Sequence, residues 1–245
     1  MLAAGRVRAA CSTRAGGVSA PPYDSLNLGA HVGDDAAHVQ SNRAAWARHL
    51  GARPVYLQQV HGTAVVALSP DTPDGAVADA CVSTTPGLAC TIMVADCLPV
   101  LLASADGRAV AAAHAGWRGL AAGVIEAAHQ ALRERCGTAA AISAWLGPCI
   151  GPQAFEVGDE VREAFVVQQS DAGRCFARHA VPGKWWADLQ GLARMRLASL
   201  GVRDVHGNDG SPAWCTHADA SRFFSHRRDR VSGRFAASVW IDSRA

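Results

Sequence analysis

Two apolar stretches that follow each other in the chain constrain the fold more than any other part of the sequence. Residues 88–103 read LACTIMVADCLPVLLA and residues 107–117 read GRAVAAAHAGW, with the turn sequence SADGR at their junction. Short apolar runs bounded by turn residues are typical of buried strands. The two stretches therefore predict a buried hairpin with His114 at the end of its second strand.

Helices and further strands are predicted on both sides of this hairpin. Apolar residues at helical spacing predict helices at residues 39–51, 116–136, 158–168 and 186–201. Ser41 is the predicted N-cap of the first helix, and Gly51 is its predicted end. Gly137 is the predicted end of the second helix. Further strands are predicted at residues 55–68, 140–147 and 234–241. Such a mixture indicates an α+β or a layered α/β fold.

Composition and charge limit the class of protein. The 245 residues, 49% of them hydrophobic and without repeats or a linker, suit one domain over residues 1–245. A net charge of +2 predicts no nucleic-acid or membrane partner. Because neither a secretory signal nor a membrane-spanning run is found, we expect a cytoplasmic location, with an organelle transit peptide as the alternative. The eight cysteines include no Cys-x-x-Cys pair, so we expect mostly free thiols.

Three residues that suit a metal ion stand at ends or interruptions of predicted strands. They are His61 in QQVHG, Cys97 in VADCLP and His114 in AHAGWRG. Two imidazoles and one thiolate are good zinc ligands, and three protein ligands leave the open position that a catalytic zinc needs. The alternative from spacing alone is that these are ordinary half-buried histidines and a buried cysteine.

Neighbouring residues could support such a centre. We expect Asp96 to accept an imidazole N–H, and Gln58 or Gln59 to orient a bound water. A fourth protein ligand, Cys215 or His217, would instead make the zinc structural and the protein a binding module without enzyme activity. Near these motifs, Cys149 lies in a rigid LGPCIGP turn before a helix, where a cysteine can be an acidified nucleophile.

Candidate substrate residues gather toward the two ends of the chain. Arg14 and Asn27 lie in an irregular, glycine-containing segment of the kind that forms substrate-facing loops. Arg227 belongs to an arginine pair before the last strand, and Arg118 lies beside an expected helix start, so both could bind phosphate or carboxylate. The alternative for each arginine is a solvated surface charge.

Six motifs taken together resemble one known family over nearly the whole chain. They are STRAGGVS with PYDSLNLGAHVGDD, QQVHG, ADCLPVLL, AHAGWRGLAAGVI, WLGPCIGPQAFEVGDEV, and FFSHRRD with GRFAA. The sequence resembles the YfiH/YlmD family, also named laccase-domain or polyphenol oxidase proteins. The resemblance implies a layered α/β/β/α fold with mixed sheets, similar to cysteine hydrolases. It also implies zinc bound by His61, Cys97 and His114, with copper as the alternative metal.

The resemblance implies more than one activity. Members resemble purine nucleoside phosphorylases acting on adenosine, inosine or methylthioadenosine, with an adenosine deaminase activity. Alternatives are an amidase that removes a misincorporated amino acid from a UDP-linked peptidoglycan precursor, and a copper-dependent polyphenol oxidase. Multicopper chemistry is disfavoured because the sequence has no His-x-His pair, and Met1, Met93 and Met195 offer no axial ligand beside a Cys/His set. The resemblance therefore implies a zinc enzyme whose small-molecule substrates are a purine nucleoside and phosphate.

Overall fold

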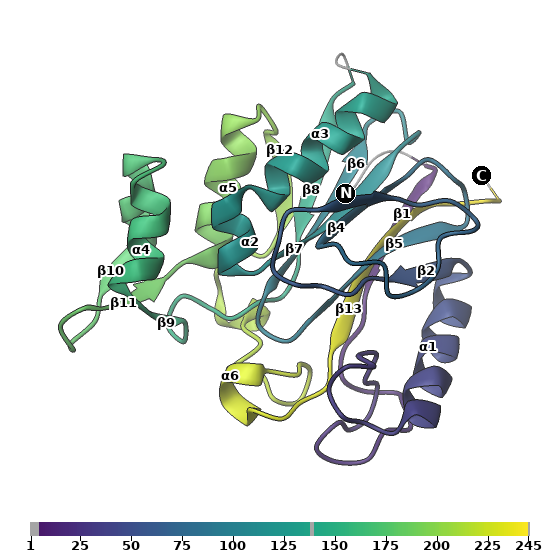
Figure 1. Ribbon diagram of the computed structural model, residues 1–245, viewed down its shortest axis with the longest axis horizontal. Coiled ribbons are helices and arrows are strands. Elements are labelled where there is room, and N and C mark those ends of the chain that lie inside the picture. The colour runs from purple at the N-terminus through teal and green to yellow at the C-terminus, as the bar shows by residue number, and fades with distance from the viewer. Residues whose placement is uncertain (1–4, 138–139, 245) are drawn as a thin grey trace.

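Two β-sheets pack face to face in the computed structural model, which describes residues 5–137 and 140–244 (Figure 1). The larger sheet has six strands in the order β12 (Asp204–Gly207), β8 (Ile142–Leu146), β6 (Leu98–Ser104), β7 (Val110–Ala115), β4 (Ala80–Ser83) and β3 (Val65–Ala67). The smaller sheet has four strands in the order β1 (Val7–Cys11), β13 (Phe235–Ile241), β5 (Leu88–Val94) and β2 (Arg53–Tyr56). Both contain parallel and antiparallel pairs, as predicted.

Helices cover the outer sides of both sheets. The smaller sheet is covered by α1 (Ala36–Leu50), and the larger by α2 (Trp117–Ala122), α3 (Val124–Cys136) and α5 (Leu189–Ser199). Two further helices are α4 (Asp159–Val166) and the short α6 (His226–Asp229), and 3-10 turns lie at Ser170–Cys175 and Pro212–Trp214. A third sheet contains β10 (Phe176–Arg178), β11 (Lys184–Ala187) and β9 (Glu156–Gly158), and it projects to one side with α4 (Figure 1). No helix in the described part of the chain is long and apolar enough to cross a bilayer.

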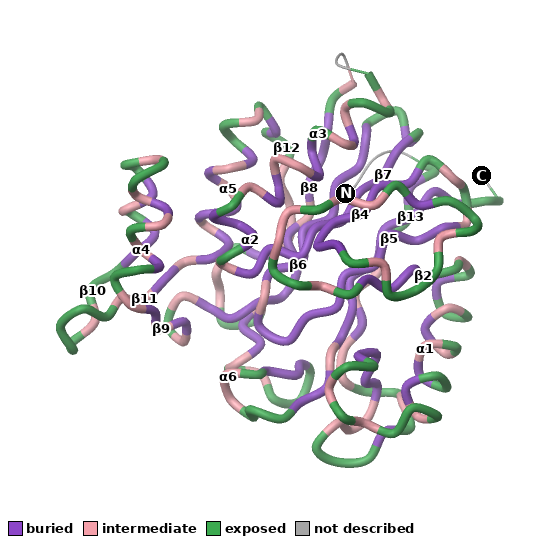
Figure 2. Tube along the Cα trace, in the orientation of Figure 1, coloured by how far each residue is buried: buried purple, intermediate pink, exposed green. Residues whose placement is uncertain are grey.

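Alternate residues of the central strands face different apolar cores. On β5, Ile92 packs between the two sheets, whereas Met93 packs against α1. On β6, Leu101 faces the space between the sheets, and Leu102 faces the helices of the other side. Both faces of these strands are therefore buried, as Figure 2 shows. Burial on both faces explains why the strands read as continuous apolar runs. The layers are α/β/β/α, and the predicted fold class is confirmed.

The predicted hairpin is present, but the apolar run before it is not one strand. Strands β6 and β7 pair antiparallel across the expected turn. The run 88–103 divides at residues 95–97 into β5 and β6, which belong to different sheets. Asp96, with φ of 95°, makes the bend between them. Hydrophobicity predicted burial correctly, but it carries no information on which sheet a strand joins.

Two other predicted elements are also divided. The stretch 55–68 forms β2 in the four-stranded sheet and β3 in the six-stranded sheet, with the loop around His61 between them. The predicted helix 116–136 breaks into α2 and α3 at Gly123, whose φ of 100° suits glycine. The predicted helix 186–201 begins only at Leu189, because Trp186 belongs to β11.

The first helix begins earlier than predicted. Its N-cap is Asp35, whose Oδ1 accepts the N–H groups of Ala37 (2.7 Å) and His38 (3.3 Å). Ser41, the predicted cap, lies inside the helix. Gly51 ends the helix with φ of 61°, as predicted.

Replacing Asp35 by Ala should therefore lower the Tm by about 2–4 °C, because the two N–H groups lose their acceptor. Ser41→Ala is the matched control and should leave the Tm unchanged or slightly raised, since Ala is the better helix former. Differential scanning calorimetry on both variants checks this. A larger loss for Ser41→Ala would place the cap where the sequence predicted it.

Candidate metal centre

One buried carboxylate, that of Asp79, holds the loop that carries His61. Asp79 precedes β4, and its side chain is fully buried. It accepts the backbone N–H groups of Val60 (3.1 Å), His61 (2.9 Å) and Gly62 (2.7 Å). These charge-assisted bonds keep His61 at φ of 62°, in the left-handed region that residues other than glycine rarely adopt.

The same carboxylate orients the second histidine. His114 is the penultimate residue of β7 and is only 4% exposed. Its Nδ1–H donates to Oδ1 of Asp79 over 2.8 Å. This bond leaves Nε2 of His114 available as a ligand, in the manner of a carboxylate–histidine–metal triad.

Asp79 thus has the role that the sequence assigned to Asp96, and the prediction for Asp96 is wrong. Asp96 accepts a hydrogen bond from Oγ1 of Thr216 (2.6 Å) and another from the N–H of Arg227 (2.7 Å). The bend at Asp96 turns its carboxylate toward the segment 216–227 and away from the imidazoles. Sequence reasoning missed Asp79, whose only signal is an acidic residue directly before a buried strand.

The three predicted ligands come together. The ligand atoms of His61, Cys97 and His114 lie within 4.8 Å of one another, and Sγ of Cys97 is 3.6 Å from Nε2 of His61. A tetrahedral zinc with ordinary Zn–S and Zn–N bonds would separate such atoms by about 3.6 Å. The donor set and the spacing therefore fit a metal ion, and the cluster is not three unrelated core residues.

Gly116 keeps the space beside the cluster open. A Cβ on this residue would lie 2.7 Å from Cδ2 of His61 and 2.9 Å from Sγ of Cys97. Within the described part of the chain, no fourth His, Cys, Asp or Glu joins the three ligands. One coordination position is therefore left for a small molecule.

The charges of the cluster favour the metal-binding form of the thiol. Burial raises the pKa of Cys97, but the charge of His114 and hydrogen bonds from His114 and His61 outweigh burial and lower the pKa to about 6. Burial lowers the pKa of His114, yet the charge of Cys97 and the bond to Asp79 raise it to about 9. Without metal, Cys97 is a thiolate at neutral pH, and the thiolate is the species that binds metals.

Gln58 and Gln59 form hydrogen bonds that hold the loop before His61 in place. Gln59 donates from Nε2 to the carbonyl oxygen of Met93 (2.8 Å) and accepts the Met93 N–H at Oε1 (2.9 Å). The main chain of Gln58 bonds to Ala76 and Ala78, and its side chain is exposed. The prediction that either glutamine orients a bound water stays a prediction.

Three of the four predicted substrate residues are engaged within the protein. Arg14 donates to the carbonyl oxygens of Asp24 and Ala220, pairs with the Asp24 carboxylate and covers Phe224. Asn27 is fully buried and bonds to main-chain groups of Gly29 and Arg234. The guanidinium of Arg227 donates to the carbonyl oxygen of Glu156, whereas Arg118 is exposed and stacks on Trp117. Their contact with substrate or phosphate stays a prediction.

Cys149 lacks the surroundings of an acidified nucleophile. The residue is fully buried, and burial together with nearby negative charges raises the pKa of its thiol well above the ordinary value. Its Sγ donates to Oε1 of Gln190 over 3.6 Å. A buried thiol of raised pKa packs as an apolar group and is inert.

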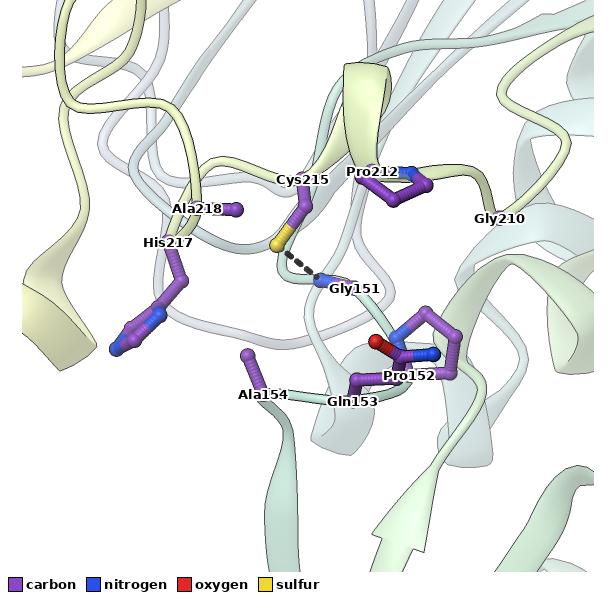
Figure 3. Close-up of a pocket in the computed structure, with 9 residues that line it drawn as sticks. All are labelled: Gly151, Pro152, Gln153, Ala154, Gly210, Pro212, Cys215, His217 and Ala218. Carbon is purple, nitrogen blue, oxygen red and sulfur yellow. Dashed lines mark hydrogen bonds between the residues drawn. The ribbon is translucent and has the colours of Figure 1, made fainter.

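The proposed fourth ligands, Cys215 and His217, line a separate cavity of about 220 Å³. Figure 3 shows the Cys215 sulfur directed at the Gly151 N–H, which it accepts over 3.2 Å, and the His217 ring pointing away from this sulfur. Neither residue belongs to the cluster around Cys97. The arrangement therefore argues against a closed, purely structural zinc site.

Residues 8–242 match the family model described as multi-copper polyphenol oxidoreductase laccase. The chain belongs to this family. A purine nucleoside phosphorylase of Pseudomonas aeruginosa is 51% identical over 96% of this chain and 94% of its own length. Purine nucleoside phosphorylase YfiH of Escherichia coli is 49% identical over 96% of this chain and 94% of the relative.

Solved structures of family members share the fold. A Neisseria meningitidis protein superposes with a TM-score of 0.90 at 42% identity, covering 98% of this chain and 96% of that chain. YlmD from Geobacillus stearothermophilus superposes with a TM-score of 0.83 at 28% identity, covering 98% of this chain and 93% of that chain. The resemblance to the YfiH/YlmD family is confirmed.

Cys97 should be the first thiol to react with iodoacetamide in the metal-free protein. Its alkylation rate should rise through a pH of about 6, because that is where the thiolate forms. Cys136, a half-buried thiol whose pKa is raised, is the internal control and should react only in alkaline solution. Peptide mass spectrometry over a pH series measures both rates, and a midpoint near 9 for Cys97 would contradict the charge pairing.

Asp79→Asn should weaken zinc binding by about 10- to 100-fold, because the charge that orients His114 and the His61 loop is lost. Competition with a chromogenic chelator measures the affinity. Asp71→Asn, at an exposed position, removes the same charge and should leave zinc binding unchanged. Equal affinities for the Asp79 variant and wild type would show that this carboxylate does not support the centre.

Proposed function

We propose that the protein is a zinc-dependent purine nucleoside phosphorylase that acts on adenosine, inosine and methylthioadenosine and also deaminates adenosine. The observation that carries the proposal is the cluster of His61, Cys97 and His114, with one side left open by Gly116. Two relatives of about half-identical sequence are named purine nucleoside phosphorylases, which supports the substrate class.

The donor set favours zinc over copper. Copper centres with two histidines and a cysteine usually add a distant methionine. Here Sδ of Met93 lies on the α1 side of its sheet near Arg43, and Sδ of Met195 lies near Cys175. Met1 lies outside the described residues. The described residues also form a single group of metal ligands, whereas multicopper oxidation needs several. Polyphenol oxidation is therefore not the function we propose.

The chain's own residues prepare the site for group transfer. In phosphorolysis, a phosphate oxygen bonds to C1′ of the ribose while the C1′–N9 bond breaks, and the purine leaves with that electron pair and takes a proton. Developing charge in such a reaction is stabilised by fixed dipoles and cations. His61, Cys97 and His114 would hold zinc, and Asp79 fixes the tautomer of His114. A bound zinc ion supplies a Lewis acid.

Deamination would use the same open side. Water adds at C6 of adenosine, and ammonia leaves from the same carbon. Zinc deaminases of other folds carry out this reaction with histidine and cysteine ligands. The donor set here has the same chemistry, so one centre can support both activities.

Product chromatography after incubation of the zinc-loaded protein with adenosine, with and without phosphate, tests the function. We expect phosphate-dependent adenine and ribose 1-phosphate together with phosphate-independent inosine. Cys97→Ala should abolish both products because it removes a metal ligand. Cys136→Ala, at the end of α3, is the matched control and should retain full activity.

Two outcomes would overturn the proposal. Full activity of Cys97→Ala at unchanged zinc content would mean that the reaction does not use this cluster. Unchanged adenosine under all conditions would mean that the substrate is wrong. Release of a free amino acid from a UDP-linked peptidoglycan precursor would then identify the amidase, with the same metal ligands.

A further inference from the structure

Arg234 is a half-buried arginine beside the metal centre that the sequence did not single out. It directly precedes β13, whose first residue, Phe235, pairs with Val94 at the end of β5. Strand β5 ends where the chain bends through Asp96 to Cys97. Arg234 therefore lies next to this bend, and the charges of Cys97 and Asp96 act on its guanidinium.

Residues of the 27–29 loop fix Arg234 in this place. Its N–H donates to Oδ1 of the fully buried Asn27 over 2.8 Å, and its carbonyl oxygen accepts the N–H of Leu28 over 2.9 Å. A Cβ on Gly29 would lie 2.8 Å from Cγ of Arg234. Residue 29 must therefore be glycine for the arginine side chain to lie here.

The guanidinium of Arg234 keeps donors free. Nη1 donates to the carbonyl oxygens of Ser232 (2.9 Å) and Gly233 (3.0 Å) and is 3.4 Å from Oγ of Ser232. Within residues 5–137 and 140–244, Nε and Nη2 have no protein acceptor, and no carboxylate pairs with the side chain. Arg14 and Arg227, by contrast, direct their guanidinium groups to protein oxygens. A half-buried arginine with free donors is suited to binding an oxyanion.

Positive charge dominates around these donors. Burial lowers the pKa of His31, and the charges of Arg234, Arg43 and His114 lower it further, so these groups lie close to one another. The carboxylates on this side already have partners. Asp96 accepts bonds from Thr216 and Arg227, Asp34 accepts bonds from Asn27 and Ser19, and Asp74 pairs with Arg43. The negative charge without such a partner is the Cys97 thiolate, which a metal ion would bind. An anion of two or three charges would compensate the excess of positive charge.

We propose that Arg234 is the oxyanion-binding residue of the metal centre, that it takes inorganic phosphate, and that Asn27 is its positioning residue. Phosphate as the ligand rests on the proposed phosphorylase function. Nε and Nη2 present the paired N–H groups that match two oxygens of a phosphate. The site places this phosphate beside Cys97, where it can reach the ribose of a nucleoside bound at the open side of the cluster.

Isothermal titration calorimetry of zinc-loaded protein with inorganic phosphate tests the site without turnover. Arg234→Gln should weaken phosphate binding by about 10- to 100-fold, because two charge-assisted bonds are lost. Arg234→Lys keeps the charge but loses the paired donors, so its phosphate affinity should lie between those of wild type and Arg234→Gln. Arg203→Gln, an exposed arginine between α5 and β12, removes the same charge and should bind phosphate as wild type does. In turnover, the KM for phosphate should rise in Arg234→Lys while the KM for adenosine and the zinc content stay unchanged.

The results separate this inference from the proposed function. Phosphate binding that depends on Arg234 without any adenine formation would support the anion site and overturn the phosphorylase. Adenine formation with an unchanged phosphate affinity in both Arg234 variants would support the phosphorylase and overturn the inference. Failure of wild type to bind free phosphate would also overturn it. Titration with UDP then shows whether the arginine takes a phosphate ester of a larger substrate.

Discussion

The geometry of the candidate metal centre depends on the hydrogen bonds of one buried carboxylate, that of Asp79. It accepts three consecutive N–H groups of the His61 loop and the Nδ1–H of His114. Burial raises the pKa of Asp79, but hydrogen bonds from His114, Gly62 and Val60 and the charge of His114 outweigh burial, and the pKa is lowered. The Asp79 side chain thus fixes the main chain at His61 and the imidazole ring of His114. Removing it would release both histidines, although neither lies next to Asp79 in the sequence.

Two of the three candidate metal ligands lie where the chain passes between the sheets. Between β2 and β3 the passage contains His61, and between β5 and β6 it contains Cys97. Each passage includes a residue other than glycine at positive φ, namely His61 and Asp96. Such conformations cost of order 1–3 kcal/mol and persist where the surroundings impose them. The bonds to Asp79 and Thr216 provide those surroundings, and the bends turn the two ligands toward His114.

Local pattern was sufficient for the apolar strands, for the hairpin that contains His114, and for placing His61, Cys97 and His114 at ends or interruptions of strands. These features depend on hydrophobicity and on residue types at strand ends, which are readable along the chain. The division of residues 88–103 was not readable, because both halves are equally apolar and differ only in the sheet they join. Asp79 and Arg234 were missed for a related reason. Their partners lie 35 residues away at His114 and 207 residues away at Asn27, and no local spacing reports such contacts.

Asn27 has structural contacts that the sequence did not show. The irregular segment around it predicts a residue that faces substrate, and in the structure its buried amide bonds to main-chain groups of Gly29 and Arg234 and to the Asp34 carboxylate. The bonds to Asp79, the paired bonds between Gln59 and Met93, and those of Asn27 hold the loops around the candidate centre through protein groups. Loops held in this way lose less conformational entropy on binding than mobile loops do. Because His61 and Cys97 come from passages between the two sheets, a metal bound there would restrain the packing of those sheets and stabilise the native state.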